Sequence, residues 1–295
     1  MTTQAVAEVV TNKADILYVA SLALSLVLFR AVFGALLSAA YADDRYTYVL
    51  LVPCLSALLL IRATSGIRPV SRLCPRGGLP VLTAGLLLYR NAGEALSIGN
   101  FTLTRAMFAV VLFWAGTVLA LYGPEAFRVS AAAWCFLLFV VPLPSGMLDS
   151  LAVVLQGQSA NAAAALFRLT GMPAVRQGVL FSLPGVDIEI AKECSGIRSS
   201  LALVLMNGVA AQMMLQSYAK KAALIVLSIP FVVCKNAIRI VTISWLGVYV
   251  NPAFFHGALH RNGGLVFSLL DTVALFVALT LLRRTETSGS PVART

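Results

Sequence analysis

Charged side chains are scarce in this 295-residue chain. They make up 12% of its residues, against roughly 25% in an ordinary soluble domain. Hydrophobic residues account for 59% of the chain, and apolar runs of membrane-spanning length recur along it. So few charges cannot cover a water-facing surface, which excludes a soluble enzyme and a disordered regulator. The composition predicts a polytopic membrane protein.

Cysteine and histidine are also few, and their spacing excludes most metal and disulfide frameworks. The cysteine number is odd and no CxxC pair occurs, so neither a disulfide scaffold nor a structural zinc site is expected. The two histidines, His256 and His260, have an HxxxH spacing that would suit two metal ligands on one helix face. No carboxylate or further histidine lies nearby, so we predict no metal and no other cofactor. The five cysteines are Cys54, Cys74, Cys135, Cys194 and Cys234.

The net charge of +10 comes from lysines and arginines placed at the ends of apolar runs. This is the positive-inside pattern of membrane proteins, which needs no nucleic acid to explain it. No basic and aromatic stacking motif accompanies the charge, so no nucleic-acid partner is predicted. Counting basic residues in short loops predicts that both termini lie in the cytoplasm. The expected location is the inner, cytoplasmic membrane of the cell, with membrane lipid as a partner of the chain.

The predicted fold is an all-α polytopic membrane protein of about eight transmembrane helices. No internal repeat or soluble domain is visible, so residues 1–284 are predicted to form a single transmembrane domain. The polar segment 285–295 is predicted to be a disordered cytoplasmic tail. The expected spans are residues 16–37, 46–62, 79–90, 104–122, 129–143, 197–216, 221–248 and 263–282.

With this topology the longest outer-face connection covers residues 144–196. Residues 147–170 carry few charges and several amides, which predicts a helix lying in the membrane interface. Apolar and acidic residues alternate over 186–190, which is strand periodicity, after a Pro184-Gly185 turn pair. The sequence therefore predicts a short outer-face β-hairpin that runs directly into Cys194.

Cys194 stands where this strand ends and a helix starts. The first amides of a helix have no partners and carry partial positive charge, which lowers the pKa of a thiol placed there. Ser195 is a candidate N-cap, and Gly196 keeps the backbone near the sulfur uncluttered. The alternative is an inert buried thiol at the entrance of a span.

The seventh apolar run contains three polar residues, Lys235, Asn236 and Arg239. Ionisable residues within spans usually face a bundle interior or a water-filled cavity. Asn236 and Arg239 are three apart and share one helix face. Arg239 lies 18 residues after Lys221, or roughly 27 Å along a helix, which predicts a position near the outer leaflet. The alternative is an arginine that only anchors the helix end.

The histidines lie in the connection before the last span, on the same predicted outer side. Each is a candidate general acid or base, and a plain solvated or interfacial histidine is the alternative. A nucleophilic cysteine needs a proton donor or acceptor and a group that holds the oxyanion. Cys194, His260 and Arg239 would supply these three roles if the fold brings them together.

Several segments resemble the signature of exosortases and archaeosortases. They are DIEIAKECSGIRSS at 187–200, NAIRI at 236–240, HRNGGLVF at 260–267 and DDRYTYVLLVP at 43–53. The resemblance implies a multi-spanning cysteine enzyme that sorts proteins as a transpeptidase. Its expected substrates carry a C-terminal Pro-Glu-Pro-like motif, an apolar span and a basic cluster. Proteins of exopolysaccharide or envelope assembly are further expected partners.

The resemblance also implies roles for individual residues. Cys194 matches the nucleophile, Arg239 the motif arginine and His260 the motif histidine, with His256 as the alternative histidine. Supporting positions are those that surround these three in the motifs: Glu193, Ser195, Gly196, Arg198 and Asn236.

Two rival functions fit the same sequence. Intramembrane polar residues and a proline-interrupted span would also suit a transporter or channel, although no inverted repeat is visible. A non-catalytic scaffold of an envelope polysaccharide export system is the second rival. Loss of processing in a Cys194 variant would separate the enzyme from both.

Overall fold

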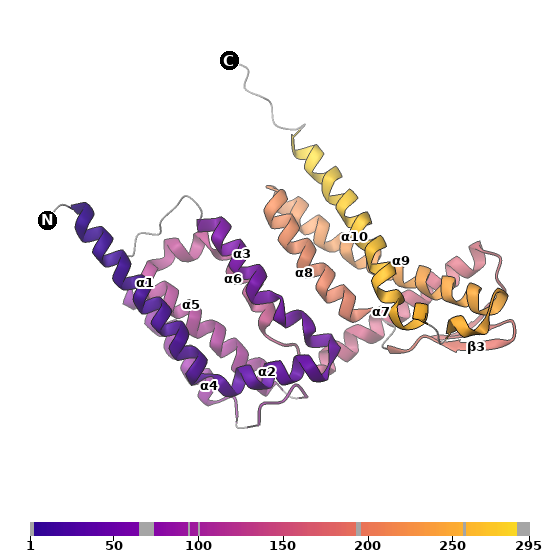
Figure 1. Cartoon of the computed structure of the whole chain (residues 1–295), viewed down its shortest axis with the longest axis horizontal. Helices are drawn as coiled ribbons and strands as arrows, with labels where there is room; N and C mark the ends of the chain where they lie inside the picture. The colour runs from indigo at the N-terminus through magenta and orange to yellow at the C-terminus, as the bar shows by residue number, and fades with distance from the viewer. Residues whose placement is uncertain are drawn as a thin grey trace, which may run out of the picture. The chain divides into compact units, whose positions relative to one another are not determined.

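The computed structural model describes residues 3–64, 74–93, 95–99, 101–192, 196–255 and 258–287. For residues 3–12 and 258–266 it describes the backbone alone. The chain is mostly helical and divides into two compact units, Met1–Gly146 and Met147–Thr295. Figure 1 shows the whole chain, and the two units are described separately below.

The N-terminal unit consists of helices and short 3-10 turns. Proline at the start of α4 suits its first turn, where a backbone N–H has no helical partner. The elements are α1 (Thr3–Leu28), α2 (Arg30–Ala42), η1 (Asp44–Leu50), α3 (Val52–Thr64), α4 (Pro75–Arg90), α5 (Thr102–Val129), α6 (Ala131–Leu137), η2 (Leu138–Val140) and the first residues of α7 (Ser145–Leu169).

The first predicted span is bent at Phe29, where α1 gives way to α2 at an angle of 69°. The Phe29 ring is fully buried and packs edge-on against Tyr89 and Phe113, with ring centroids 4.8 and 5.5 Å away. Edge-to-face aromatic pairs contribute about 0.5–1.5 kcal/mol beyond the area they bury. The bend therefore accompanies a buried aromatic cluster that joins the first helix pair to α4 and α5.

Helices α4 and α5 pack closely because glycine lies at their interface. A Cβ added to Gly116 on α5 would stand 2.5 Å from the backbone nitrogen of Leu82 on α4. No side chain fits at that distance. Small residues that let backbones approach are the usual means of helix association in membranes, where lipid is as apolar as leucine. The close contact between α4 and α5 therefore depends on glycine at position 116.

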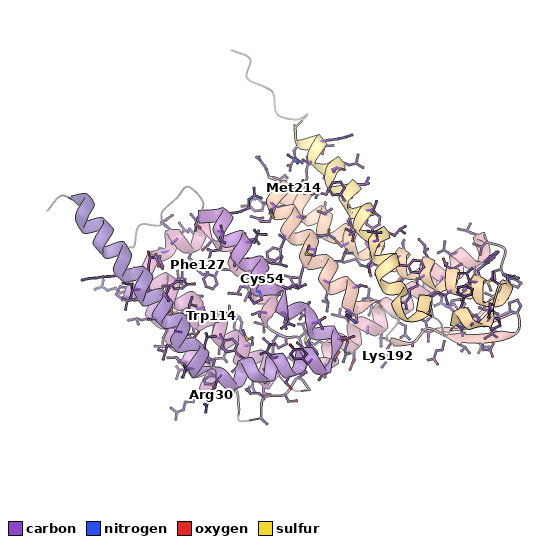
Figure 2. All side chains as sticks on the ribbon, in the orientation of Figure 1. Arg30, Cys54, Trp114, Phe127, Lys192 and Met214 are labelled. Carbon is purple, nitrogen blue, oxygen red and sulfur yellow. The ribbon has the colours of Figure 1, made fainter. Side chains whose placement is uncertain are left out.

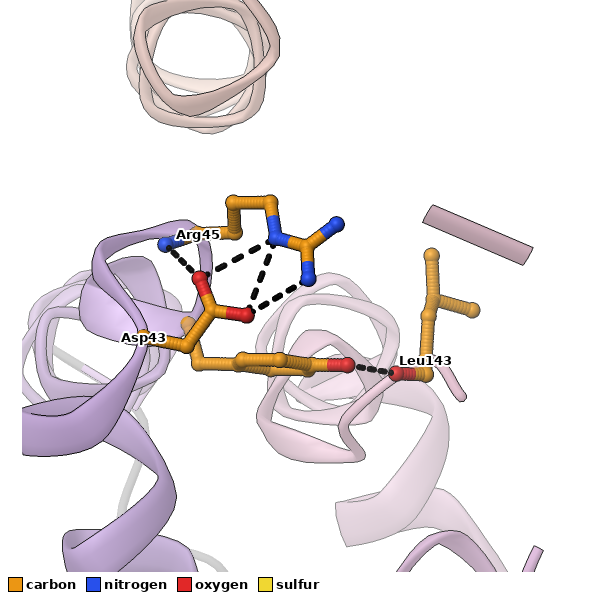
Figure 3. A network of polar contacts seen from close by, with 4 residues as sticks. Asp43, Arg45 and Leu143 are labelled. Atoms are coloured by element: carbon orange, nitrogen blue, oxygen red, sulfur yellow. Dashed lines mark hydrogen bonds and ion pairs between the residues drawn. The ribbon is translucent and has the colours of Figure 1, made fainter. Parts of the chain in front are cut away.

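Polar contacts hold the loop that precedes α7 (Figure 3). The Tyr46 hydroxyl donates a hydrogen bond to the carbonyl oxygen of Leu143 at 2.8 Å, and Tyr46 is fully buried. Beside it, Asp43 accepts hydrogen bonds from the backbone amide and guanidinium of Arg45. These bonds to Arg45 lower the pKa of Asp43. The DDRYTYVLLVP segment is therefore tied to the Pro142-containing loop.

The C-terminal unit contains most of α7, a small sheet and three long helices. The sheet has the order β1-β2-β3, and both pairs are antiparallel. Within this unit α8, α9 and α10 pack side by side (Figure 1). The elements are β1 (Val175–Gln177), β2 (Leu180–Leu183), β3 (Val186–Glu189), α8 (Ile197–Met214), α9 (Tyr218–Tyr249), η4 (Pro252–Phe255) and α10 (Ala258–Thr287).

One face of the sheet packs on α7 and α9. Phe181 and Leu183 of β2 are buried together with Phe167 of α7 and Val241 of α9. The two phenylalanine rings lie 5.3 Å apart. Strand residues alternate between this apolar face and an exposed face, as a half-buried sheet requires. A hairpin forms at the predicted residues as β2 and β3, turning at Pro184-Gly185, whereas its placement on the outer face is not confirmed. Strand β1 adds a strand that the sequence analysis did not predict.

Large apolar side chains project outward along the helices of both units (Figure 2). Val27, Val226 and Leu269 are 71%, 63% and 65% exposed. Exposed apolar surface on this scale is typical of a lipid-facing protein, because a soluble monomer rarely exposes large contiguous apolar patches. The structure therefore agrees with the membrane class expected from composition.

Among the described residues, four helices are long and apolar enough to cross a membrane, and two bent pairs raise the count to six. The second bent pair joins Ala131–Val140 to Ser145–Leu169 at 96°, where the fifth span was predicted. The predicted span 79–90 lies in the 16-residue α4, and 263–282 lies in α10. Eight spans are therefore not confirmed. Helix α10 also continues to Thr287, three residues into the segment predicted as a tail.

The start of α9 is capped by a carboxylate from α10. The amides of Gln216 and Ser217 donate to Glu286 oxygens at 3.0 and 2.9 Å, whereas the Ser217 side chain makes no capping bond. These bonds lower the pKa of Glu286 below its ordinary value of 4.5. A lowered pKa contributes stability above the unfolded value, and this contribution is lost as the pH falls through the folded value.

We expect the Glu286→Gln variant to lack part of the acid sensitivity of the wild type. The melting temperature of the solubilised protein, measured from pH 7 down to pH 3, should fall more steeply below about pH 4.5 in the wild type. Glu125→Gln is the matched control, since its pair with Arg128 is exposed and such pairs contribute little. Parallel curves for wild type and Glu286→Gln would contradict the capping role.

Candidate functional site

Several predicted site residues lie outside the described part of the structure. They are Glu193, Cys194, Ser195 and His256. His260 lies in the first turn of α10, where only the backbone is described. The site is therefore built from the residues that flank the cysteine in the chain and from those that α7 and α9 bring to them.

Helix α8 begins directly after the cysteine motif, at Ile197, and its N-cap is Gly196. The cap was expected at Ser195 and lies one residue later. Gly196 has φ 77°, a left-handed conformation that favours glycine. The hydroxyls of Ser199 and Ser200 donate to the Gly196 carbonyl oxygen at 2.9 and 2.7 Å. Two side chains thus fix the backbone at this end of the motif.

Arg198, another predicted supporting residue, is exposed on the first turn of α8. It lies two residues after Gly196 and outside the pocket described below. Its position at a helix start is unusual for a cation, because the helix dipole favours negative charge there.

Asn236 of α9 lies beside this helix start. A Cβ placed on Gly196 would stand 3.9 Å from the Asn236 carboxamide carbon. The Asn236 side chain is only 1% exposed and donates to the Ser159 hydroxyl of α7 at 3.0 Å. The fold therefore brings together two predicted supporting residues that are 40 positions apart in the sequence, Gly196 and Asn236.

Arg239 follows one turn later and lines a pocket of about 330 Å³, a size typical of ligand sites. The half-buried Arg239 and the buried Asn236 both belong to the part of the pocket lining that α9 provides. The pocket lies between β3 and α9, with Phe255 of η4 also in its lining. Its lining residues are Val186, Asp187, Ile188, Glu189, Ile190, Asn236, Arg239, Ile240, Ile243, Ser244 and Phe255.

A buried ion pair involves Lys235, the residue that precedes Asn236 on α9. The Lys235 ammonium is 3.4 Å from the Asp271 carboxylate of α10, and their side chains are each 4% exposed. The same ammonium donates to the Ser199 hydroxyl at 2.8 Å. Because Ser199 itself bonds to the Gly196 carbonyl, a chain of polar contacts runs from α10 through α9 to the end of the cysteine motif.

A comparison with protein-family models identifies the chain. The family described as transmembrane exosortase (Exosortase_EpsH) matches residues 38–277, which is most of the sequence. The chain belongs to the transmembrane exosortase family. No curated protein and no solved structure matches it.

The exosortase match includes all four segments that carry the resemblance and extends over parts of both compact units. Asn236 and Arg239 lie on one face of α9, as their three-residue spacing predicted, and both line the pocket. Among the described residues no group of three or more His, Cys, Asp or Glu side chains is placed to hold a metal ion.

Sequence reasoning missed several residues of this exosortase site. Gln156 of α7 is buried, and its amide donates to the Ile190 carbonyl at the end of β3. Ser159, Ser199 and Asp271 were also not selected. The one available signal was Asp271, a lone carboxylate inside the apolar run of α10, since such residues are usually paired.

Proposed function

We propose that this exosortase is a membrane cysteine transpeptidase or protease that cleaves a C-terminal sorting signal. In this proposal Cys194 is the nucleophile, Arg239 holds negative charge and His260 transfers the proton. The substrate is an exported protein with a Pro-Glu-Pro-like motif followed by an apolar span. Eight spans with both termini in the cytoplasm of the cell would place this chemistry on the outer side of the inner membrane.

The observation that carries the proposal is the convergence of two motifs at the start of α8. Gly196, two residues after Cys194, lies beside Asn236, and Arg239 lines a pocket one turn further along the same face of α9. A pocket that has an arginine wall and adjoins a cysteine motif suits an acyl-transfer site, since such a site needs a nucleophile and a group for the oxyanion.

The proposed reaction has two halves. The Cys194 thiolate attacks the carbonyl carbon of the scissile peptide bond, and the negative charge that develops on oxygen faces the Arg239 guanidinium. The carbon–nitrogen bond breaks, His260 gives a proton to the leaving amine and a thioester remains on Cys194. An acceptor amine or a water molecule then gives a proton to His260 and attacks the thioester carbonyl carbon, and the carbon–sulfur bond breaks to release the Cys194 thiolate.

Partners follow from the same proposal. The acceptor would belong to the cell envelope, and proteins of exopolysaccharide assembly would supply or receive the sorted product. The helices of this chain expose long apolar side chains. The chain would therefore lie in the same membrane as a substrate that is anchored by an apolar span.

Capture of the thioester tests the proposed function. The solubilised full-length protein is incubated with a sorting-signal substrate, quenched in acid and digested, and the Cys194 peptide is analysed by mass spectrometry. We expect a hydroxylamine-sensitive adduct on Cys194 whose mass defines the cleavage point. In Arg239→Ala its rate of formation should fall by about 10²–10³-fold, the loss typical of one oxyanion donor.

The matched control for Arg239→Ala is Arg168→Ala, which removes an exposed arginine at the end of α7. That variant should form the adduct at the wild-type rate. Cleavage that proceeds with no adduct on Cys194, or with an adduct on another residue, would refute the proposed mechanism.

A further inference from the structure

The β3 strand lies at the edge of its sheet. The order β1-β2-β3 gives β3 one strand neighbour, β2, within the described residues. One side of an edge strand carries backbone N–H and C=O groups that pair with no other strand, and these groups can bind an additional strand. The side of β3 away from β2 is therefore a candidate binding surface.

The hydrogen-bond register shows which residues present these groups. The Ile190 amide donates to the Val179 carbonyl at 3.1 Å, and Val186 is paired with Leu183 across a two-residue turn. Hydrogen-bonded positions alternate along an antiparallel strand. Positions 186, 188 and 190 therefore face β2, and the amides and carbonyls of Asp187 and Glu189 face away from it.

This outward edge forms one wall of the pocket beside Arg239. Five consecutive residues, 186–190, line the pocket. Successive side chains of a strand point to opposite faces, so neither face of the strand alone could contribute all five. The pocket is therefore lined by the edge of β3, which carries the backbone groups of Asp187 and Glu189.

The opposite wall is one face of α9. The lining positions 236, 239, 240, 243 and 244 follow the i, i+3, i+4, i+7, i+8 spacing of a single helix face. Two of them are isoleucines, Ile240 and Ile243, and Arg239 supplies a cation. An edge strand opposite a partly apolar helix face is the arrangement by which several peptide-binding domains add an extended peptide to a sheet.

We propose that this groove, bounded by β3 and α9, binds an extended segment of the substrate protein as a fourth strand paired with β3. The inference rests on the proposed function and names its substrate-binding mode. The segment would exchange hydrogen bonds with the backbone of Asp187 and Glu189, set apolar side chains against Ile240 and Ile243, and place an acidic side chain near Arg239. Strand β3 leads along the chain to Cys194, so the same pairing would direct the bound segment toward the nucleophile.

A Pro-x-Pro motif in the proposed substrate is compatible with this pairing. A strand added at an edge pairs on one side only, so the N–H groups of alternate residues are not needed. Prolines two positions apart lose donors that face the same way. The residue between them keeps the N–H and C=O that would face β3.

Peptide binding to variants of β3 tests the groove. The probe is a fluorescein-labelled twelve-residue peptide with a Pro-Glu-Pro motif, and fluorescence anisotropy measures its Kd for the solubilised full-length Cys194→Ala protein, in which binding is separated from cleavage. Asp187→Pro and Glu189→Pro remove the outward N–H groups and no bond to β2. We expect each to raise Kd about tenfold, whereas Asp187→Ala and Glu189→Ala should change Kd less than about twofold.

A scan of the peptide keeps the test valid if a proline variant fails to fold, because it uses unchanged β3. Methylation of one backbone nitrogen at a time should weaken binding at every second residue and leave the residues between them unaffected. Equal effects at all positions, or equal Kd values for the proline and alanine variants, would overturn the proposal. It would also fail if the proline variants changed the oligomeric state and left peptide binding intact, because β3 would then pair with a second copy of the chain.

The two proposals can fail separately. An alternating methylation pattern with no thioester on Cys194 would retain the groove and reject the reaction. A thioester with no alternation would retain the reaction and reject strand pairing.

Discussion

Cys194→Ala is expected to abolish cleavage of a sorting-signal substrate while the protein still inserts and folds. Removal of a covalent nucleophile from a comparable enzyme costs on the order of 10⁶-fold in kcat. Alanine retains the small size of cysteine but offers no atom that can form the thioester. The measurement is the fraction of a tagged substrate cleaved in membranes that contain equal amounts of wild-type and variant protein.

The matched controls remove cysteines that belong to no motif. Cys54, labelled in Figure 2, and Cys234 are both free and exposed, and Cys54→Ala and Cys234→Ala should cleave at the wild-type rate. Cleavage by Cys194→Ala at the wild-type level would eliminate the enzyme hypothesis. A transporter would instead keep its substrate flux in Cys194→Ala proteoliposomes.

The second large effect is expected from Lys235→Met. This substitution leaves the Asp271 carboxylate, whose side chain is 4% exposed, without the ammonium 3.4 Å away. Removing one partner of a buried pair costs about 3–5 kcal/mol, because an uncompensated charge stays buried. The free energy of unfolding of the solubilised protein, measured by denaturant titration, should fall by that amount.

The double variant Lys235→Met/Asp271→Leu identifies the cause of this loss. If the cost arises from an unpaired charge, removing the second charge should restore most of the stability, since apolar replacements of a whole buried pair are often neutral. Arg128→Ala breaks an exposed pair with Glu125 and should cost less than about 1 kcal/mol. Additive losses from Lys235→Met and Asp271→Leu would contradict a direct pair.

Local pattern predicted several elements closely. The helix expected at 147–170 is α7, Ser145–Leu169, and the hairpin turns at Pro184-Gly185. Strand β1 was missed because Val175–Gln177 is only three residues long and carries no apolar alternation. The bend at Phe29 was also missed, because the rings that bury it belong to Tyr89 and Phe113, more than fifty positions away.

The residues of the candidate site also divide into those that a local sequence pattern indicated and those that only the fold brings together. Asn236 and Arg239 were visible as polar residues inside an apolar run, and their three-residue spacing predicted their shared face. Ser159 was not visible, because a serine in a helix shows no distinguishing local pattern, and its bond to Asn236 spans 77 positions. Cys194 and His256 lie outside the described residues, and only the backbone of His260 is described, so their convergence with Arg239 stays a prediction.

The Lys235–Asp271 pair also has a consequence for biogenesis. In the proposed eight-span arrangement α9 leaves the ribosome first, and a lone lysine at the centre of a helix raises the free energy of insertion by about 2.5–3.5 kcal/mol. Helix α10 carries the opposite charge, Asp271, which also raises the free energy of inserting that helix alone. Partitioning into lipid is therefore more favourable for a hairpin of both helices than for either one, so the translocon would release them together.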